Sequence, residues 1–168
     1  MFSREPEVTT IVQANDADAV AQARELFCEY EAESQLDLCF QNFEAELAGL
    51  PGAYAPPEGR LLLALYEGHL AGSVALRKFE DGICEMKRLF VRPAFRGQGI
   101  GRALARRIIE EARAAGYSTM KLDTLARMRA AVTLYESLGF HRIEAYRPNP
   151  LEDVVYMELT LTGGGSVG

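Results

Sequence analysis

Three glycines stand where a hydrophobic run gives way to a helix-like run, in the segment "RGQGIG" at 96–101. Glycine inside a helix costs about 1 kcal/mol relative to alanine, so this cluster at a helix start requires a reason. A helix N-terminus presents unpaired N–H groups and a partial positive charge, and both attract phosphate. Glycine has no Cβ to obstruct that approach. The segment is therefore a physically sensible cradle for a pyrophosphate, to which Arg96 and Arg102 can add charge.

Two familiar phosphate-binding motifs do not fit this segment. The dinucleotide fingerprint requires G-x-G-x-x-G, and here the third glycine comes one residue too early. The P-loop requires Gly-Lys-Ser/Thr, which is absent from the segment. Taken alone, the glycines are also compatible with a simple surface turn.

The spacing R-x-x-G-x-G, carried by Arg96, Gly99 and Gly101, resembles the acetyl-CoA signature of the GCN5-related N-acetyltransferase (GNAT) superfamily. The preceding "EMKRLFVRP" at 85–93 is similar to the fourth strand of that family, and "LYESLGF" at 134–140 is similar to its later motif. The order of elements around both motifs also agrees. The resemblance covers most of the chain and is strongest from about 61 to 140.

The resemblance implies that acetyl-CoA is the acetyl donor. Backbone groups of the fourth strand would pair with the pantetheine arm as an added strand does, and the diphosphate would lie on the following turn. The implied cofactor-binding residues are Leu89, Phe90, Val91, Arg96, Gly97, Gln98, Gly99, Ile100, Gly101 and Arg102. Many family members carry an asparagine seven residues before the tyrosine of the later motif, where this chain has Met128. That cofactor contact is therefore missing or supplied elsewhere.

The resemblance also implies two catalytic residues. Tyr135, in the later motif, would protonate the departing thiolate, and Glu85 matches a glutamate base of the histone-acetylating branch. Each has a structural alternative. Tyr135 shares an apolar helical stripe with Ala131 and Leu138, which is typical of a core residue. Glu85 lies in a strand near lysine and arginine, which also suits a cross-strand ion pair.

The implied chemistry is acyl transfer to an amine by direct attack. An ordinary lysine-like amine has a pKa of about 10.4, so a positioned base helps to make it a nucleophile at pH 7. A backbone N–H near Leu89 would stabilise the oxyanion, and Cys84 on the same strand need not act as a nucleophile. Asp123 either orients the amine or caps the next segment. We predict an N-acetyltransferase for a small or amino-acid-like primary amine, and retain two alternatives: a protein lysine or N-terminus as acceptor, and a non-catalytic acyl-CoA-binding module.

The elements that must position these residues follow from periodicity and turn chemistry. We expect strands at about 8–15, within 60–91 (three strands, with turns at 67–69 and 80–82), at 118–125, at 140–146 and at 153–161, and helices at about 17–31, 40–49, 100–115 and 128–139. The order indicates a mixed α/β fold. The resemblance implies a mostly antiparallel sheet of six to seven strands with about four helices on both faces. We expect one domain over 1–162 and a flexible tail at 163–168.

The amino-acid composition of the chain limits which partners it binds and in which cellular compartment it works. The net charge of −6 argues against general nucleic-acid binding. Three cysteines, at 28, 39 and 84, form no CxxC pair and suit reduced thiols in a cytoplasm, while two isolated histidines argue against a metal site. No apolar run approaches the ~20 residues that span a bilayer. The predicted partner is therefore a small-molecule amine, without nucleic acid or membrane, and a homodimer is left open.

Overall fold

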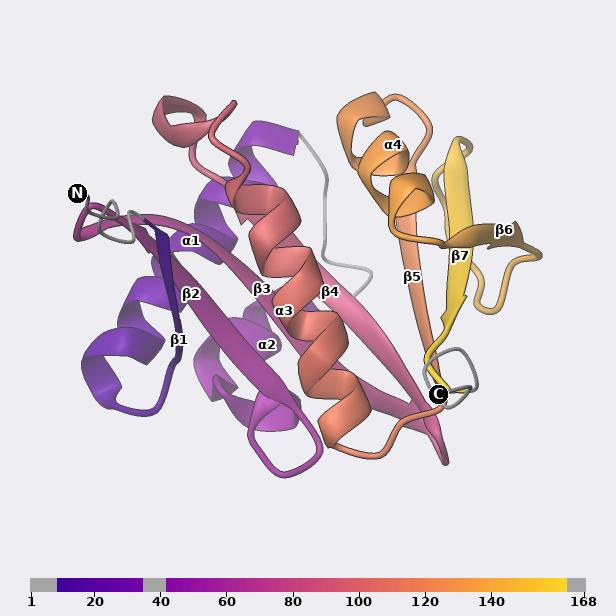
Figure 1. The fold of residues 1–168 in the computed structure, drawn as a ribbon, viewed down its shortest axis with the longest axis horizontal. Helices are drawn as coiled ribbons and strands as arrows, with labels where there is room; N and C mark the ends of the chain where they lie inside the picture. Colours follow the sequence, from indigo (N-terminus) through magenta and orange to yellow (C-terminus); the bar gives the residue numbers. More distant parts are fainter. Residues whose placement is uncertain (1–8, 35–41, 163–168) are drawn as a thin grey trace, which may run out of the picture.

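The computed structural model describes residues 9–34 and 42–162. Its strands are β1 (Thr9–Gln13), β2 (Arg60–Tyr66), β3 (His69–Glu80), β4 (Ile83–Val91), β5 (Thr119–Leu125), β6 (His141–Ile143) and β7 (Val154–Thr160). The helices are α1 (Ala17–Ser34), α2 (Phe43–Gly49), α3 (Ile100–Ala114) and α4 (Arg129–Ser137), with short 3-10 turns η2 (Gly52–Tyr54) and η3 (Pro93–Phe95). The seven strands form one sheet in the order β1-β2-β3-β4-β5-β7-β6 (Figure 1). All neighbouring strands are antiparallel except β4 and β5.

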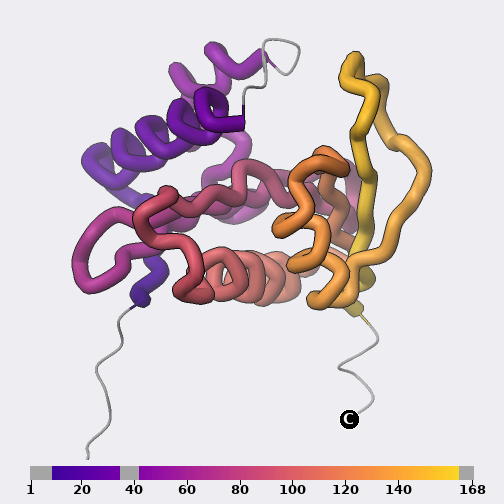
Figure 2. The backbone as a smooth tube through the Cα atoms, turned by 90° about the horizontal axis from the view of Figure 1, so that it is seen from above, coloured from indigo at the N-terminus to yellow at the C-terminus, as the bar shows by residue number. Residues whose placement is uncertain are grey.

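Helices cover both faces of the sheet, because apolar residues on its central strands point alternately to either side. Leu62 and Ala64 of β2 pack in a cluster with the buried stripe of α3, whereas Leu61 and Leu63 pack in a second cluster with α1 and α2. Figure 2 shows α1 and α2 on one side of the sheet and α3 on the other. The mixed α/β architecture predicted from the sequence is confirmed.

The predicted elements agree with the observed ones apart from their ends. Helix α1 continues three residues beyond the predicted end at 31, and β6 stops at Ile143 rather than 146. Residues 144–150 contain two prolines, which donate no backbone hydrogen bond and discourage a longer strand. The predicted start of α2 at 40, Cys39 and the tail at 163–168 lie outside the described residues.

The parallel strands β4 and β5 diverge soon after they meet. They pair only over 83–85 and 119–121, and then separate toward α4 (Figure 1). On its other side β4 carries a bulge, since Ser73 opposes Phe90 but Ala75 opposes Lys87. Arg88 and Leu89 therefore oppose the single residue between, and Arg88 has a left-handed φ of 62°. For a residue other than glycine such a conformation costs on the order of 1–3 kcal/mol and persists only where the surroundings hold it.

Candidate active site

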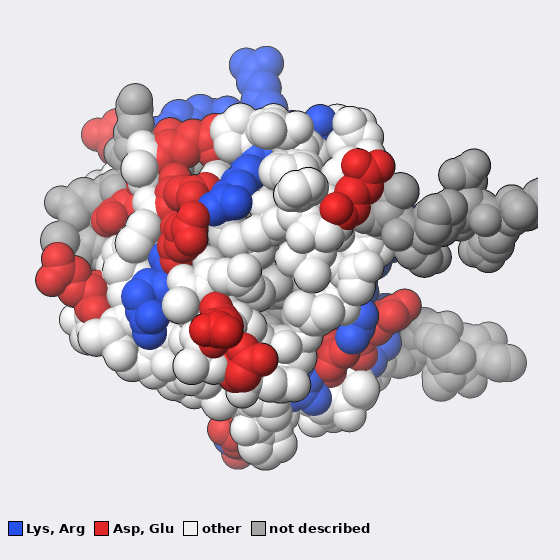
Figure 3. Space-filling model, turned by 90° about the vertical axis from the view of Figure 1, so that its left-hand side faces the viewer, with Lys and Arg blue, Asp and Glu red and all other residues white. Residues whose placement is uncertain are grey.

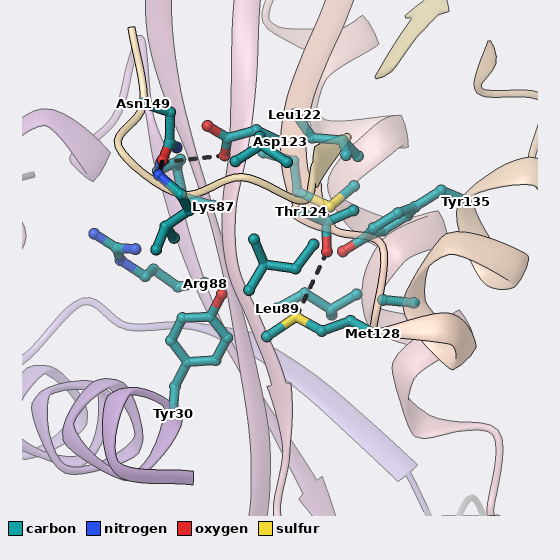
Figure 4. A pocket seen from close by; sticks show the side chains of 15 residues that line it. Tyr30, Lys87, Arg88, Leu89, Leu122, Asp123, Thr124, Met128, Tyr135 and Asn149 are labelled. Carbon is teal, nitrogen blue, oxygen red and sulfur yellow. Dashed lines mark hydrogen bonds and ion pairs between the residues drawn. The ribbon is translucent and has the colours of Figure 1, made fainter. Parts of the chain in front are cut away.

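A pocket occupies the space opened by the divergence of β4 and β5 (Figure 4). Its walls come from α1, β4, β5, α4 and the segment leading into β7. The lining residues are Tyr30, Met86, Lys87, Arg88, Leu89, Leu122, Asp123, Thr124, Leu125, Met128, Ala131, Tyr135, Asn149, Leu151 and Val154. The pocket thus gathers four residues singled out from the sequence, namely Leu89, Asp123, Met128 and Tyr135. It adds Lys87 and Asn149, which were not singled out.

The pocket has a polar end and an apolar end. Figure 4 shows Lys87, Asp123 and Asn149 close together, with Leu89, Met128 and Tyr135 further along the cavity. The Lys87 and Asp123 side chains are only 4% and 10% exposed, and Lys87 Nζ lies 3.9 Å from Asp123 Oδ1. Burial lowers the pKa of Lys87 to about 8, against the opposing effect of the Glu85 and Asp123 carboxylates. Asp123 Oδ2 also accepts a hydrogen bond from Arg147 Nη1 (3.2 Å), so the carboxylate at the polar end lies between two cationic side chains.

Tyr135 serves both interpretations that the sequence left open. Its ring is buried in the core, 5.7 Å from the ring of Phe140, and yet the residue lines the pocket. In Figure 4 its hydroxyl points toward Thr124 on the facing strand. Burial raises the pKa of Tyr135 above its ordinary value, so the hydroxyl retains its proton at neutral pH. A proton donor in the pocket must meet that condition.

Glu85 lies at the point where β4 and β5 separate but is not among the residues that line the pocket. Its fully buried carboxylate accepts hydrogen bonds from Arg77 Nε (3.0 Å), from the Tyr146 hydroxyl (2.8 Å) and from Arg147 Nη2 (3.0 Å). Burial alone would raise the pKa of Glu85. The hydrogen bonds from Arg147 and the nearby positive charges outweigh burial and lower this pKa to about 2.

These contacts favour the ion-pair interpretation of Glu85 over the role of general base. A carboxylate whose pKa is held this low by hydrogen bonds from arginine is a weak proton acceptor. The cross-strand partner is Arg77, which directly opposes Glu85 on β3, rather than the neighbouring basic residues of β4. Arg147, in the segment before β7, forms a second ion pair with Glu85.

The glycine turn has the form that the phosphate hypothesis requires. Gly99 is the N-cap of α3 with φ 80°, and Gly97 has φ 84°, both in the left-handed region that favours glycine. A Cβ on either residue would meet nothing within 4 Å, so the surface above the helix start is open. Gly101 differs, since its Cβ would lie 3.7 Å from Val91 and face the protein. The first helical bond after the cap joins Ala103 N–H to the Gly99 carbonyl (3.0 Å), so the N–H groups of 100–102 precede it.

The arginine of the R-x-x-G-x-G signature points to α1. Arg96 forms an ion pair with Glu33 and donates from Nε to the Val91 carbonyl (2.8 Å). Its guanidinium also lies 5.8 Å from the Phe90 ring centroid. Among the other predicted cofactor residues, the Gln98 side chain accepts a hydrogen bond from Tyr66 (3.2 Å).

Phe90 and Ile100 have side chains in the two hydrophobic clusters, so only their backbones can contact a cofactor. The side of β4 that faces β5 is left without a strand partner in the described part of the chain after residue 85. This edge can accept the extended arm that the sequence assigns to Leu89 and Val91.

Met128, at the position of the family asparagine, is the N-cap residue of α4 and lines the pocket. Its sulfur accepts a weak hydrogen bond from Thr124 Oγ1 at 3.6 Å. The asparagine amide is therefore replaced here by an apolar thioether. Asn149, on the segment before β7, brings an amide into the same pocket, and its Oδ1 accepts a hydrogen bond from the Leu151 N–H (2.9 Å).

The chain belongs to the GNAT acetyltransferase family, since the model of the acetyltransferase (GNAT) family matches residues 20–140. An uncharacterised N-acetyltransferase of Schizosaccharomyces pombe is 46% identical over 136 residues, covering 80% of this chain and 83% of the relative. N-acetylaspartate synthetase of Danio rerio is 41% identical over 100 residues, covering 58% of this chain and 36% of the relative. A putative acetyltransferase of Salmonella typhimurium, solved with its cofactor acetyl-CoA, has a TM-score of 0.66 at 22% identity, covering 92% of this chain and 95% of that structure. The chain is accordingly a GNAT N-acetyltransferase, a class that depends on acetyl-CoA.

None of the described helices is both long and apolar enough to cross a membrane. Within the same residues, no group of three or more histidine, cysteine or acidic side chains is arranged to hold a metal ion.

Proposed function

We propose that this protein transfers the acetyl group of acetyl-CoA to the primary amine of a small, carboxylate-bearing molecule of the amino-acid class, by direct attack. The observation that carries the proposal is the division of the pocket. A buried Lys87–Asp123 pair stands at one end, and Tyr135 stands beside the open edge of β4 at the other.

The binding site for the acetyl donor, acetyl-CoA, is formed in this proposal by β4 and the start of α3. The free edge of β4 is the partner we propose for the amides of the pantetheine arm, and the turn from Gly97 to Arg102 is the seat for the diphosphate. In this arrangement the N–H of Leu89 donates to the thioester oxygen as negative charge develops on it. The Tyr135 hydroxyl gives its proton to the departing sulfur.

The amine that accepts the acetyl group binds, in this proposal, at the polar end of the pocket. We assign the ammonium of Lys87 to the carboxylate of the acceptor, and the carboxylate of Asp123 to its amine. Asp123 is the one carboxylate among the described lining residues, so we also assign it the acceptance of the amine proton, directly or through water. An acceptor of this class agrees with the name of the Danio rerio relative, N-acetylaspartate synthetase.

Two alternatives remain testable beside this proposal: a protein lysine or N-terminus as acceptor, and an acyl-CoA-binding module without turnover. The partner predictions from the sequence, namely no nucleic acid, no membrane and a homodimer left open, stay predictions.

A single screen separates the proposal from its alternatives. The purified protein is incubated with acetyl-CoA and amino acids, simple amines or peptides, and the N-acetylated product is detected by mass spectrometry while thiol release is followed. We expect N-acetylated amino acids. Products from peptides alone would move the acceptor to proteins, and acetyl-CoA binding without any product would favour the non-catalytic module.

A further inference from the structure

The bulge of β4 places a strained residue, Arg88, in the wall of the pocket. Arg88 has φ 62°, and Figure 4 shows its guanidinium directed away from Leu89 and Tyr135. Only 3% of the side chain is exposed. Its carbonyl accepts a hydrogen bond from Ser73 Oγ (3.3 Å) on the neighbouring strand. Something other than substrate must therefore hold this arginine.

The partner is Glu46 of α2. Arg88 Nε donates to Glu46 Oε2 (2.9 Å) and Nη2 donates to Oε1 (2.8 Å), which is the bidentate geometry of a strong charge-assisted pair. The guanidinium also lies 5.2 Å from the centroid of the Phe43 ring at the start of the same helix. The Tyr54 hydroxyl also donates a hydrogen bond to Glu46 Oε2 (3.1 Å). Helix α2 thus holds the side chain of Arg88 at three points.

We propose that Glu46 is a positioning residue, which clamps Arg88 in its left-handed conformation and so keeps the N–H of Leu89 directed at the reacting thioester. The inference rests on the proposed function, because it takes Leu89 as the oxyanion donor. A bulge re-aims the residue that follows it, and here that residue lines the pocket. Without the ion pair to Glu46, a residue other than glycine at position 88 relaxes toward ordinary β conformation. The backbone N–H of Leu89 then changes direction with it.

The proposal predicts an unusual rescue. Glu46→Ala should lower kcat by about 10–10²-fold, approaching the loss seen when an oxyanion donor is removed, and should change the KM for acetyl-CoA by less than about threefold. Arg88→Gly removes the same ion pair but accepts a positive φ without strain, so its kcat should exceed that of Glu46→Ala by at least about fivefold. The double variant Glu46→Ala with Arg88→Gly should recover most of the activity that Glu46→Ala loses. The matched control is Glu111→Ala, which breaks the ion pair with Arg60 (2.7 Å) and should leave kcat unchanged.

Three outcomes overturn the proposal. The first is a folded Glu46→Ala protein with wild-type kcat. The second is an Arg88→Gly protein as impaired as Glu46→Ala, which would mean that the guanidinium itself acts. The third is a crystal structure of the Glu46→Ala protein with residue 88 unchanged in φ. If Glu46→Ala does not fold, Glu46→Gln, which keeps one acceptor oxygen and the side-chain size, is measured in its place.

Wild-type turnover is measured first, because a protein without turnover would count against the proposed function. The clamp is tested separately by the φ of residue 88 in the Glu46→Ala structure, which requires no turnover.

Discussion

Replacing Glu85 by glutamine separates the ion-pair interpretation of this residue from the role of general base. The carboxylate has a pKa of about 2 in the folded protein against an ordinary value of 4.5. Because each pKa unit corresponds to 1.36 kcal/mol, the difference contributes about 3 kcal/mol of stability at neutral pH. Glu85→Gln keeps the size of the side chain but removes the charge that pairs with Arg77 and Arg147. We therefore expect the variant to lose about 3 kcal/mol of unfolding free energy at pH 7.

The contribution of the Glu85 carboxylate to the free energy of unfolding depends on pH in a defined direction. A lowered folded-state pKa stabilises the protein above the unfolded value near 4.5, and this contribution disappears as pH falls through the folded value near 2. The stability difference between wild type and Glu85→Gln should be full at pH 7, roughly half as large at pH 3 and nearly absent at pH 2. Urea unfolding at each pH measures it, with Glu111→Gln as a control on a more exposed ion pair.

Kinetics on the same variant complete the test. An ion-pair role predicts that any loss of turnover in the folded Glu85→Gln protein is the same across the pH range. A base role predicts a loss that alkaline pH partly restores, as more of the amine becomes neutral. Wild-type stability at all pH values, together with alkaline recovery of turnover, would refute our reasoning and return Glu85 to the position of catalytic base.

Three further substitutions test the rest of the site. Gly99→Val strains a residue with φ 80° and puts a side chain above the start of α3. Acetyl-CoA affinity, measured by calorimetry, should therefore fall at least tenfold. Unchanged affinity in a folded protein would contradict the diphosphate site. Tyr135→Phe should reduce turnover by about 10–10³-fold while acetyl-CoA still binds, and unaltered turnover where chemistry limits the rate would leave Tyr135 as core packing. Burial raises the pKa of Cys84 to about 12, so Cys84→Ala should retain wild-type turnover; a folded variant without activity would contradict direct attack.

The fold could be predicted because its signals are local. Strand β4, the short turn η3, the glycine turn and helix α3 follow each other within residues 83–114. The left-handed glycines and the apolar stripe of α3 are local patterns of that segment. Tyr135 could be assigned to the pocket for the same reason, because its motif lies within one helix and the turn after it.

The electrostatics of the site could not be predicted, because they depend on contacts between distant segments. Glu85 accepts a hydrogen bond from Arg147, 62 residues away, whereas the sequence shows only its immediate neighbours on β4. The sequence gives Lys87 no distinguishing pattern, and it enters the pocket because β4 and β5 diverge. The bulge at Arg88 is equally hidden, since no glycine marks it and its clamp, Glu46, is 42 residues away.

The role of Lys87 in acceptor choice is tested by the ratio of two specificity constants, kcat/KM, for one matched pair of acceptors. Steady-state thiol release from acetyl-CoA is measured with an α-amino acid that the screen shows to be acetylated, and with the amine that remains when its carboxylate is removed. If Lys87 binds the acceptor carboxylate at the polar end of the pocket, kcat/KM should be at least tenfold higher for the amino acid, and Lys87→Met should abolish that preference. Equal values for the two acceptors, or a preference that survives Lys87→Met, would contradict the account of how this acetyltransferase chooses its substrate.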